Sequence, residues 1–338
     1  MFVNKKTDLM DNRLFSIRLR EARLLCGYSL DQLVRVAQLR ITRQSIYRYE
    51  KGDMCPSADI LSALASALGV SEQYFYGESL QIDMPMLRSA PGYKMSADEE
   101  QRWSAQICFW AERYLRMEQA TGRNNVFVNP LSGVKISTID DAIKASNRLR
   151  TAWNCGDGPI ASVLRLLERK GIKILNRDLP DGIYGLSTWA DSVHPLMILD
   201  TNKSKSTTER LRFTACHELA HLLLSFPDTS EWSIEKRCDK FASFFLFPKS
   251  TFIEEMGSEQ RSSLTLEELI DLREVYGVSI AAQVHEAWDL RMISYEHYDW
   301  WYNKRIDKNR KEEGWGAYRF PETLGRENRI KAQLDNMK

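Results

Sequence analysis

The 338-residue chain lacks an excess of charge of either sign, because 47 Lys and Arg residues against 46 Asp and Glu residues leave a formal net charge of +1. No overall field draws such a chain to nucleic acid, so any nucleic-acid binding must come from a local patch. The sequence also lacks an apolar run of membrane-spanning length, and its first residues, MFVNKKTDLMDNR, lack the apolar core of a signal peptide. These absences predict a cytoplasmic protein with no membrane partner.

Cysteine is sparse, and no two cysteines form a Cys-x-x-Cys pair. The sequence therefore indicates neither a disulfide framework nor a cysteine zinc knuckle, and it predicts free thiols. What remains is the composition of an ordinary globular protein, 43% hydrophobic and 28% charged, with enough length for two or three domains.

Residues 12–78 carry the signals of five short helices. Ser29 and Thr42 are typical helix N-caps, and Gly27, Gly52 and Gly69 follow apolar residues at helical spacing as stop signals. The predicted helices are Phe15 to Leu25, Leu30 to Ala37, Arg43 to Tyr49, Ala58 to Leu68, and a short turn from Ser71 to Tyr76. The pattern predicts an all-α domain.

The third of these helices has two unlike faces. Ile46 and Tyr49 are expected to point inward, while a polar set points outward. Arginine can read guanine and glutamine can read adenine through paired groups on the base edges in the major groove. Taken alone, the polar face is more typical of a solvated helix than of a DNA-reading one.

The order of these elements closely resembles the helix-turn-helix domain of phage repressors and of the Xre regulators. The resemblance rests on the run T-R-Q-S-I at 42–46, the run Y-E-K-G at 49–52, Pro56, and the closing A-x-A-L-G-V-S. It implies a double-stranded DNA operator as partner. The DNA-facing surface that it implies comprises Arg43, Gln44, Ser45, Tyr47 and Arg48. Nine basic residues against seven acidic ones make the domain weakly basic, so a homodimer is expected to be needed for tight binding.

Residues 79–138 are predicted to be a linker followed by an amphipathic helix. Pro85, Pro91 and Gly92 interrupt regular structure, and Asp98 to Thr121 then has helical spacing. Five apolar residues of this helix alternate in steps of four and three, as in a short heptad seam: Trp103, Ile107, Trp110, Tyr114 and Met117. The seam allows either a dimer helix or a helix packed on the chain's own next domain.

The segment R-F-T-A-C-H-E-L-A-H-L-L-L, which ends at Leu224, predicts a continuous helix from about Glu209 to Ser225. His217 and His221 lie four residues apart and therefore share one helix face. Zinc accepts two imidazoles in this arrangement and needs a third protein ligand besides water. Glu218 lies beside the first histidine, where it can act as a catalytic base toward water at the metal.

A second predicted helix, E-K-R-C-D-K-F-A-S-F-F-L-F-P, runs from Glu235 to Pro248. Glu235 and Asp239 lie four residues apart on one side of it, and either carboxylate can complete a metal site on spacing alone.

Together the two helices resemble the ImmA/IrrE family of metallopeptidases, through R-F-T-x-x-H-E-L-x-H-L-L-L and then E-x-x-x-D-x-F-A-x-x-x-x-x-P. The run G-L-S at 185–187 and the strand-like segment before the first helix fit as well. The resemblance implies one Zn²⁺ per chain with Glu235 as third ligand, while Asp239 supports the site without binding the metal. Cys238 and Ala220 stand where alanine and glycine are commoner in the family.

Around these motifs the sequence predicts a small α+β, zincin-like domain over 139–255. The expected elements are helices from Ala142 to Trp153 and from Ile160 to Lys170, with short strands from Ile172 to Leu175, Tyr184 to Trp189 and Leu196 to Leu199. Residues 256–338 predict a mostly helical region, which is either a second helix-turn-helix or winged-helix-like unit or a set of helices packed on the metallopeptidase domain. The expected fold is thus multidomain and mainly α, with one α+β part.

Two functions fit these features. In the first, a DNA-binding regulator carries a zinc endopeptidase domain that cleaves a regulatory protein such as a repressor, in itself or in trans, and so switches gene expression. In the second, the protein is a non-proteolytic repressor or antitoxin whose zinc domain senses a ligand or holds a toxin-like partner.

Overall fold

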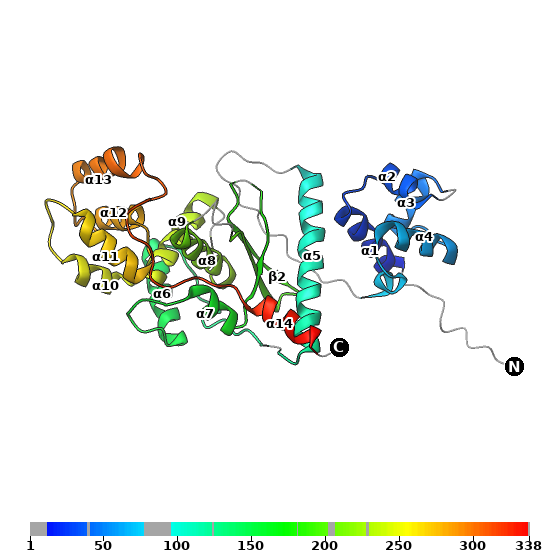
Figure 1. The fold of residues 1–338 in the computed structure, drawn as a ribbon, viewed down its shortest axis with the longest axis horizontal. Coiled ribbons are helices and arrows are strands. Elements are labelled where there is room, and N and C mark those ends of the chain that lie inside the picture. Colours follow the sequence, from blue (N-terminus) through cyan, green and yellow to red (C-terminus); the bar gives the residue numbers. More distant parts are fainter. Residues whose placement is uncertain are drawn as a thin grey trace. The chain divides into compact units, whose positions relative to one another are not determined.

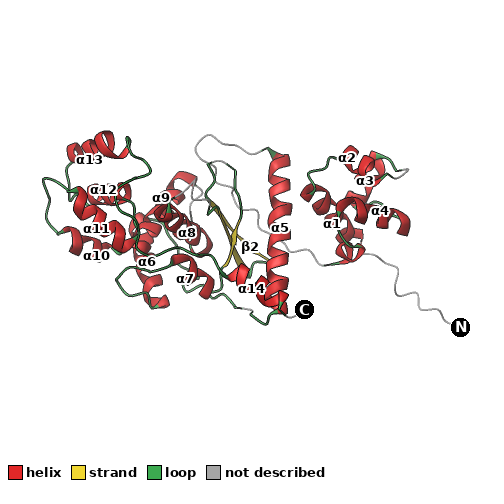
Figure 2. Ribbon diagram, viewed as in Figure 1, coloured by secondary structure: helices red, strands yellow, loops and turns green. Residues whose placement is uncertain are grey.

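The computed structural model describes residues 12–38, 41–77, 96–123, 125–180, 182–201, 207–227 and 230–336. Helices make up most of the regular structure, beside one small sheet (Figure 2). The chain divides into two compact units, the first with helices α1 to α5 and the second with α6 to α14 and the strands (Figure 1). This architecture confirms the predicted multidomain, mainly α fold with an α+β part.

The first unit begins with the five predicted helices. They are α1 (Asn12–Leu25), α2 (Leu30–Ala37), α3 (Arg43–Lys51), α4 (Ala58–Leu68) and a 3₁₀ helix, η1 (Glu72–Tyr76). Ser29 forms a capping box with Gln32 at the start of α2, and the Thr42 hydroxyl accepts the backbone N–H of Ser45 at the start of α3. Because both predicted N-caps form, the predicted starts of α2 and α3 are correct.

Helix α3 is fixed by its buried face and by an ion pair. Ile46 and Tyr49 are buried with the apolar residues of the other helices. Arg23 of α1 binds the Glu50 carboxylate with two nitrogens, at 2.5 and 2.8 Å. The opposite face of α3 is consequently held outward.

The long helix α5 (Ala97–Ala120) belongs to the first unit. Its buried Glu112 accepts a 2.6 Å hydrogen bond from the guanidinium of Arg18, which also donates to the carbonyl of Gly77. Ile107, Tyr114 and Met117 of the predicted seam are buried, whereas Trp103 and Trp110 are only half-buried. The dimer role of this helix stays a prediction.

The second unit contains a three-stranded sheet of β1 (Lys173–Asn176), β2 (Gly185–Ala190) and β3 (His194–Leu199), in the order β1-β3-β2. Strands β1 and β3 are parallel, with Ile174 opposite Met197. The helices are α6 (Ile139–Trp153), α7 (Val163–Arg169), α8 (Thr208–Leu223), α9 (Glu231–Leu246), α10 (Lys249–Met256), α11 (Leu266–Tyr276), α12 (Ile280–Asp289), α13 (Tyr295–Trp301), which continues into a π-helical turn (Tyr302–Ile306), and α14 (Arg326–Asp335).

Helices α8 and α9 form the centre of this unit. Helix α8 packs against α9, α7 and strand β3, and α9 also packs against α6. One continuous hydrophobic core contains residues from Leu131 to Trp315. The predicted metallopeptidase domain, which was expected to end at residue 255, therefore shares its core with the segment that follows. Residues 256–336 are all described and contain no strand. The region is therefore helical, and it lacks the wing that a winged-helix unit requires.

Buried ion pairs tie α8 to the C-terminal segment. Arg212 pairs with Glu322, and both side chains are essentially inaccessible to solvent. Glu209 binds Arg273 of α11 at 2.9 Å. Burial alone would raise the pKa of Glu209, but the hydrogen bond and charge of Arg273 outweigh it and hold that pKa below its usual value. Charged groups so deeply buried require such partners.

The structure also bears on the remaining sequence predictions. None of the helices within its described ranges is long and apolar enough to cross a membrane. All six cysteines lie in those ranges and are free, as predicted. Pro85, Pro91 and Gly92, which predicted the linker, fall outside the described residues.

Candidate metal centre and nucleic-acid interface

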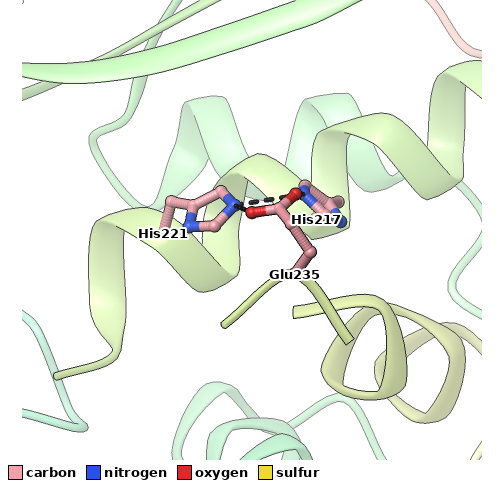
Figure 3. Close-up of side chains that lie close together, drawn as sticks. All are labelled: His217, His221 and Glu235. Atoms are coloured by element: carbon pink, nitrogen blue, oxygen red, sulfur yellow. Dashed lines mark hydrogen bonds and ion pairs between the residues drawn. The ribbon is translucent and has the colours of Figure 1, made fainter. Parts of the chain in front are cut away.

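Three side chains from two helices converge in the second unit (Figure 3). His217 and His221 extend from α8, and their Nε2 atoms lie 3.0 Å apart. Glu235 reaches them from α9, with Oε2 at 3.1 Å from Nε2 of His217 and Oε1 at 3.5 Å from Nε2 of His221. The two facing helices therefore bring the carboxylate of Glu235 on α9 to the histidine pair of α8.

Each histidine is also contacted at its other ring nitrogen. Nδ1 of His217 lies 2.8 Å from an oxygen of Asp239, and Nδ1 of His221 lies 3.3 Å from the sulfur of Cys238. A carboxylate accepts hydrogen bonds, so Asp239 suits the tautomer of His217 that carries its proton on Nδ1 and keeps the Nε2 lone pair toward His221 and Glu235. Metal-binding histidines are commonly oriented in this way.

The donor set fits a cation such as Zn²⁺. Two imidazole nitrogens and a carboxylate converge within 4.8 Å of one another, and acceptors that face each other at this range repel unless a proton or a cation lies between them. Two nitrogens and one oxygen are the ligands of many catalytic zinc sites, which keep a further position open. Of the two carboxylates left open by the sequence, the geometry favours Glu235 as ligand and places Asp239 behind His217.

Glu218 lies beside this cluster and is held by strand β2. Its side chain is mostly buried, and Ser187 donates a 2.6 Å hydrogen bond from Oγ to Oε2. Gly185, two residues earlier, has no room for a side chain, because an added Cβ would lie 2.6 Å from Thr214 and 3.4 Å from Glu218. This close approach is a physical reason for glycine in the G-L-S run.

A cleft of about 200 Å³ opens onto these groups. Its lining includes His217, Glu218, Glu235 and Asp239, together with Tyr184, Arg210 and Phe213. The guanidinium of Arg210 stacks over the ring of Tyr184 at 4.7 Å. The cleft thus brings the converging acceptors, the carboxylate of Glu218 and the guanidinium of Arg210 into one small volume.

Exchange of Asp239 for alanine is expected to weaken zinc binding by about 10- to 100-fold, because the proton and orientation of His217 are no longer fixed. Competition with a chromophoric chelator measures this loss. Lys236→Ala, on the same helix, is the matched control and should leave the zinc affinity unchanged. Equal affinity of D239A and K236A would contradict the supporting role of Asp239.

On helix α3 the structure exposes most of the predicted DNA-facing side chains. Arg43, Gln44, Tyr47 and Arg48 are exposed, and Arg43 lies 3.5 Å from Asp31 in an equally exposed pair. Ser45 differs, since it is half-buried and its hydroxyl lies 3.1 Å from that of Thr42. Four of the five side chains are therefore exposed to solvent, and Ser45 is partly covered at the start of the helix.

Several contacts of the site were not predicted from the sequence. Ser187 precedes Glu218 by 31 positions, and only the fold of β2 onto α8 brings them together. Tyr184 and Arg210 likewise meet in the cleft without any spacing signal. Cys238 was visible as an unusual residue, but its contact with His221 depends on how α9 is rotated against α8.

Comparison with known families supports two domains. A family model described as helix-turn-helix matches residues 19–75, and one described as IrrE N-terminal-like domain matches residues 167–287. The second match starts within α7, includes α8 and α9, and extends through most of α12. No curated protein and no solved structure is found to match. The chain thus joins an Xre-type helix-turn-helix domain to an IrrE N-terminal-like domain of the ImmA/IrrE kind.

Proposed function

We propose that this protein is a DNA-binding regulator whose second domain is a zinc endopeptidase that cleaves a regulatory protein and thereby switches gene expression. The observation that carries the proposal is the convergence of His217, His221 and Glu235, with Glu218 at the edge of the same cleft. A structural metal site has no use for a base beside its open position.

In this proposal His217, His221 and Glu235 hold one Zn²⁺ per chain. When bound, zinc supplies Lewis-acid polarisation of a peptide carbonyl and makes water more acidic. Glu218 accepts the proton of the attacking water and passes it to the leaving amine. Ser187 holds the Glu218 carboxylate in place, and Asp239 holds the ring of His217. The cleft positions the peptide between these groups.

The first domain directs the protein to a specific operator sequence. The exposed face of α3 carries Arg43, Gln44, Tyr47 and Arg48, and its other face packs in the core. Such a helix can enter the major groove of an operator while the rest of the domain contacts phosphates. A second copy of the chain binds the second half-site of the operator.

A proteome-derived peptide library tests the peptidase activity against many candidate target sequences at once. The zinc-loaded protein is incubated with the library, and new termini are identified by mass spectrometry. Cleavage at a recurrent sequence that stops on chelation and returns with zinc supports the proposal. Absence of cleavage in the library, in the chain itself and in candidate repressors, with zinc bound, contradicts it and favours a sensor or antitoxin.

Exchange of Arg48 for alanine is expected to weaken operator binding by about 5- to 100-fold, which is the range for one base-contacting arginine. The operator is first selected from random DNA with the full chain, and affinities are then measured at one fixed salt concentration. Arg310→Ala removes an exposed positive charge from the second unit and is the control. Equal losses in both variants would mean that α3 does not read the DNA.

A further inference from the structure

The second unit has another, larger cavity of about 1040 Å³. It is lined by the end of α6, the loop that follows, helix α7, and the C-terminal stretch from Phe320 to Arg329. None of its lining residues lines the cleft at the metal centre. Its volume is at the upper end of the range for pockets that hold small molecules.

Positive charge dominates the lining. Five lining side chains are cationic, namely Arg165, Arg169, Lys170, Arg326 and Arg329, against one carboxylate, Glu168. Glu168 is buried and engaged, since it accepts the backbone N–H of Arg326 and binds the guanidinium of Arg329 at 3.2 Å. Among the residues that the structure describes, Arg165, Arg169 and Lys170 form no ion pair with a carboxylate. The cavity therefore holds uncompensated cations that suit an anion.

Aromatic side chains provide a different kind of surface in the same cavity. The ring of Phe320 lines it and is 47% exposed. Trp153 also lines it, and the ammonium of Lys170 lies 5.6 Å from its ring centre. A flat, apolar group can stack on such a ring while charged groups beside it reach the cations.

We propose that this cavity binds a nucleotide, with its phosphates at Arg165, Arg169 and Lys170 and its base against Phe320. Guanidinium groups suit phosphate oxygens because of their paired, planar donors. Inorganic anions would use the cations alone and leave Phe320 without a role. A nucleotide uses both parts of the lining and matches the cavity in size.

The wall of the cavity also contacts α8, the helix that carries His217 and His221. Glu322, in the stretch between lining residues Pro321 and Thr323, accepts the backbone N–H groups of Val163 and Leu164 on α7. The same carboxylate pairs with Arg212 on α8, the helix that carries His217 and His221. A bound nucleotide that fixes this stretch therefore stabilises α8, which gives the site a regulatory use.

Isothermal titration of the full chain with ATP tests the binding, and it does not depend on the proposed peptidase activity. One ATP per chain is expected, with affinity reduced about tenfold or more in Arg169→Glu, because a charge-assisted contact is lost and a repulsive one is gained. Arg148→Glu, an exposed charge reversal on α6 outside the cavity, is the matched control and should bind as the wild type does.

The base contact is tested with Phe320→Ala, which should weaken ATP but not inorganic tripolyphosphate. No ATP binding, equal losses in R169E and R148E, or equal ATP affinity of F320A and wild type would each overturn the nucleotide assignment. A single-stranded oligodeoxynucleotide that displaces ATP and binds more tightly would also overturn it. The phosphate and base contacts of the cavity would then serve single-stranded nucleic acid and not a free nucleotide.

Discussion

Exchange of Glu218 for glutamine is expected to lower the rate of peptide cleavage by about a hundredfold to ten-thousandfold, while zinc stays bound. The amide keeps the size of the side chain and can still meet Ser187, but it cannot accept a proton from water. The rate is measured on a peptide taken from the library, and zinc content is measured on the same sample.

The matched control is Glu254→Gln, which neutralises an exposed glutamate of α10, outside the metal-ligand set and the lining of the cleft. It should cleave at the wild-type rate. If E218Q cleaves as fast as E254Q, Glu218 is not the base. If E218Q loses zinc as well as activity, its role lies in holding the site together, and the proposed mechanism is wrong.

Exchange of Arg212 for methionine is expected to reduce the free energy of unfolding by about 3 to 5 kcal/mol, the usual cost of leaving one partner of a buried ion pair alone. Arg212 is fully buried, pairs with Glu322 and also donates to the carbonyls of Ile160 and Tyr276. Methionine fills much of the volume but satisfies none of these acceptors. Urea unfolding of the full chain, followed by circular dichroism, measures the loss.

A second variant separates charge from packing. In the double variant R212M/E322Q no uncompensated carboxylate is left, so part of the lost stability should return. Arg319→Met removes contacts with Asp271 and Glu274 that are at least partly exposed to solvent, and it should cost at most about 1 kcal/mol. A loss in R212M no larger than that in R319M would show that the buried pair does not stabilise the fold.

The sequence predicted what depends on local chemistry. Ser29 and Thr42 predicted helix starts correctly because an N-cap needs only residues within its own turn. His217 and His221 could be paired because the period of one helix fixes their separation. The four exposed residues of α3 followed from the same period, once Ile46 and Tyr49 were assigned to the core.

Other features depend on how distant segments meet, and spacing cannot reveal them. The choice between Glu235 and Asp239 depends on how α9 is rotated against α8, because both carboxylates share one side of α9. Spacing also did not show that Ser45, which was expected to face DNA, is partly buried with its hydroxyl 3.1 Å from that of Thr42. The pairing of Arg212 with Glu322 joins residues 110 positions apart, for which a single sequence holds no signal.

The most direct test of this account is the zinc content of the purified protein, measured by elemental analysis for wild type, His217→Ala, Glu235→Ala and Lys236→Ala. We expect about one zinc per chain in the wild type and in K236A, with loss or strong weakening of zinc binding in H217A and E235A. Full zinc content in H217A and E235A, or none in wild type after zinc is offered back, would contradict a metal centre at these residues.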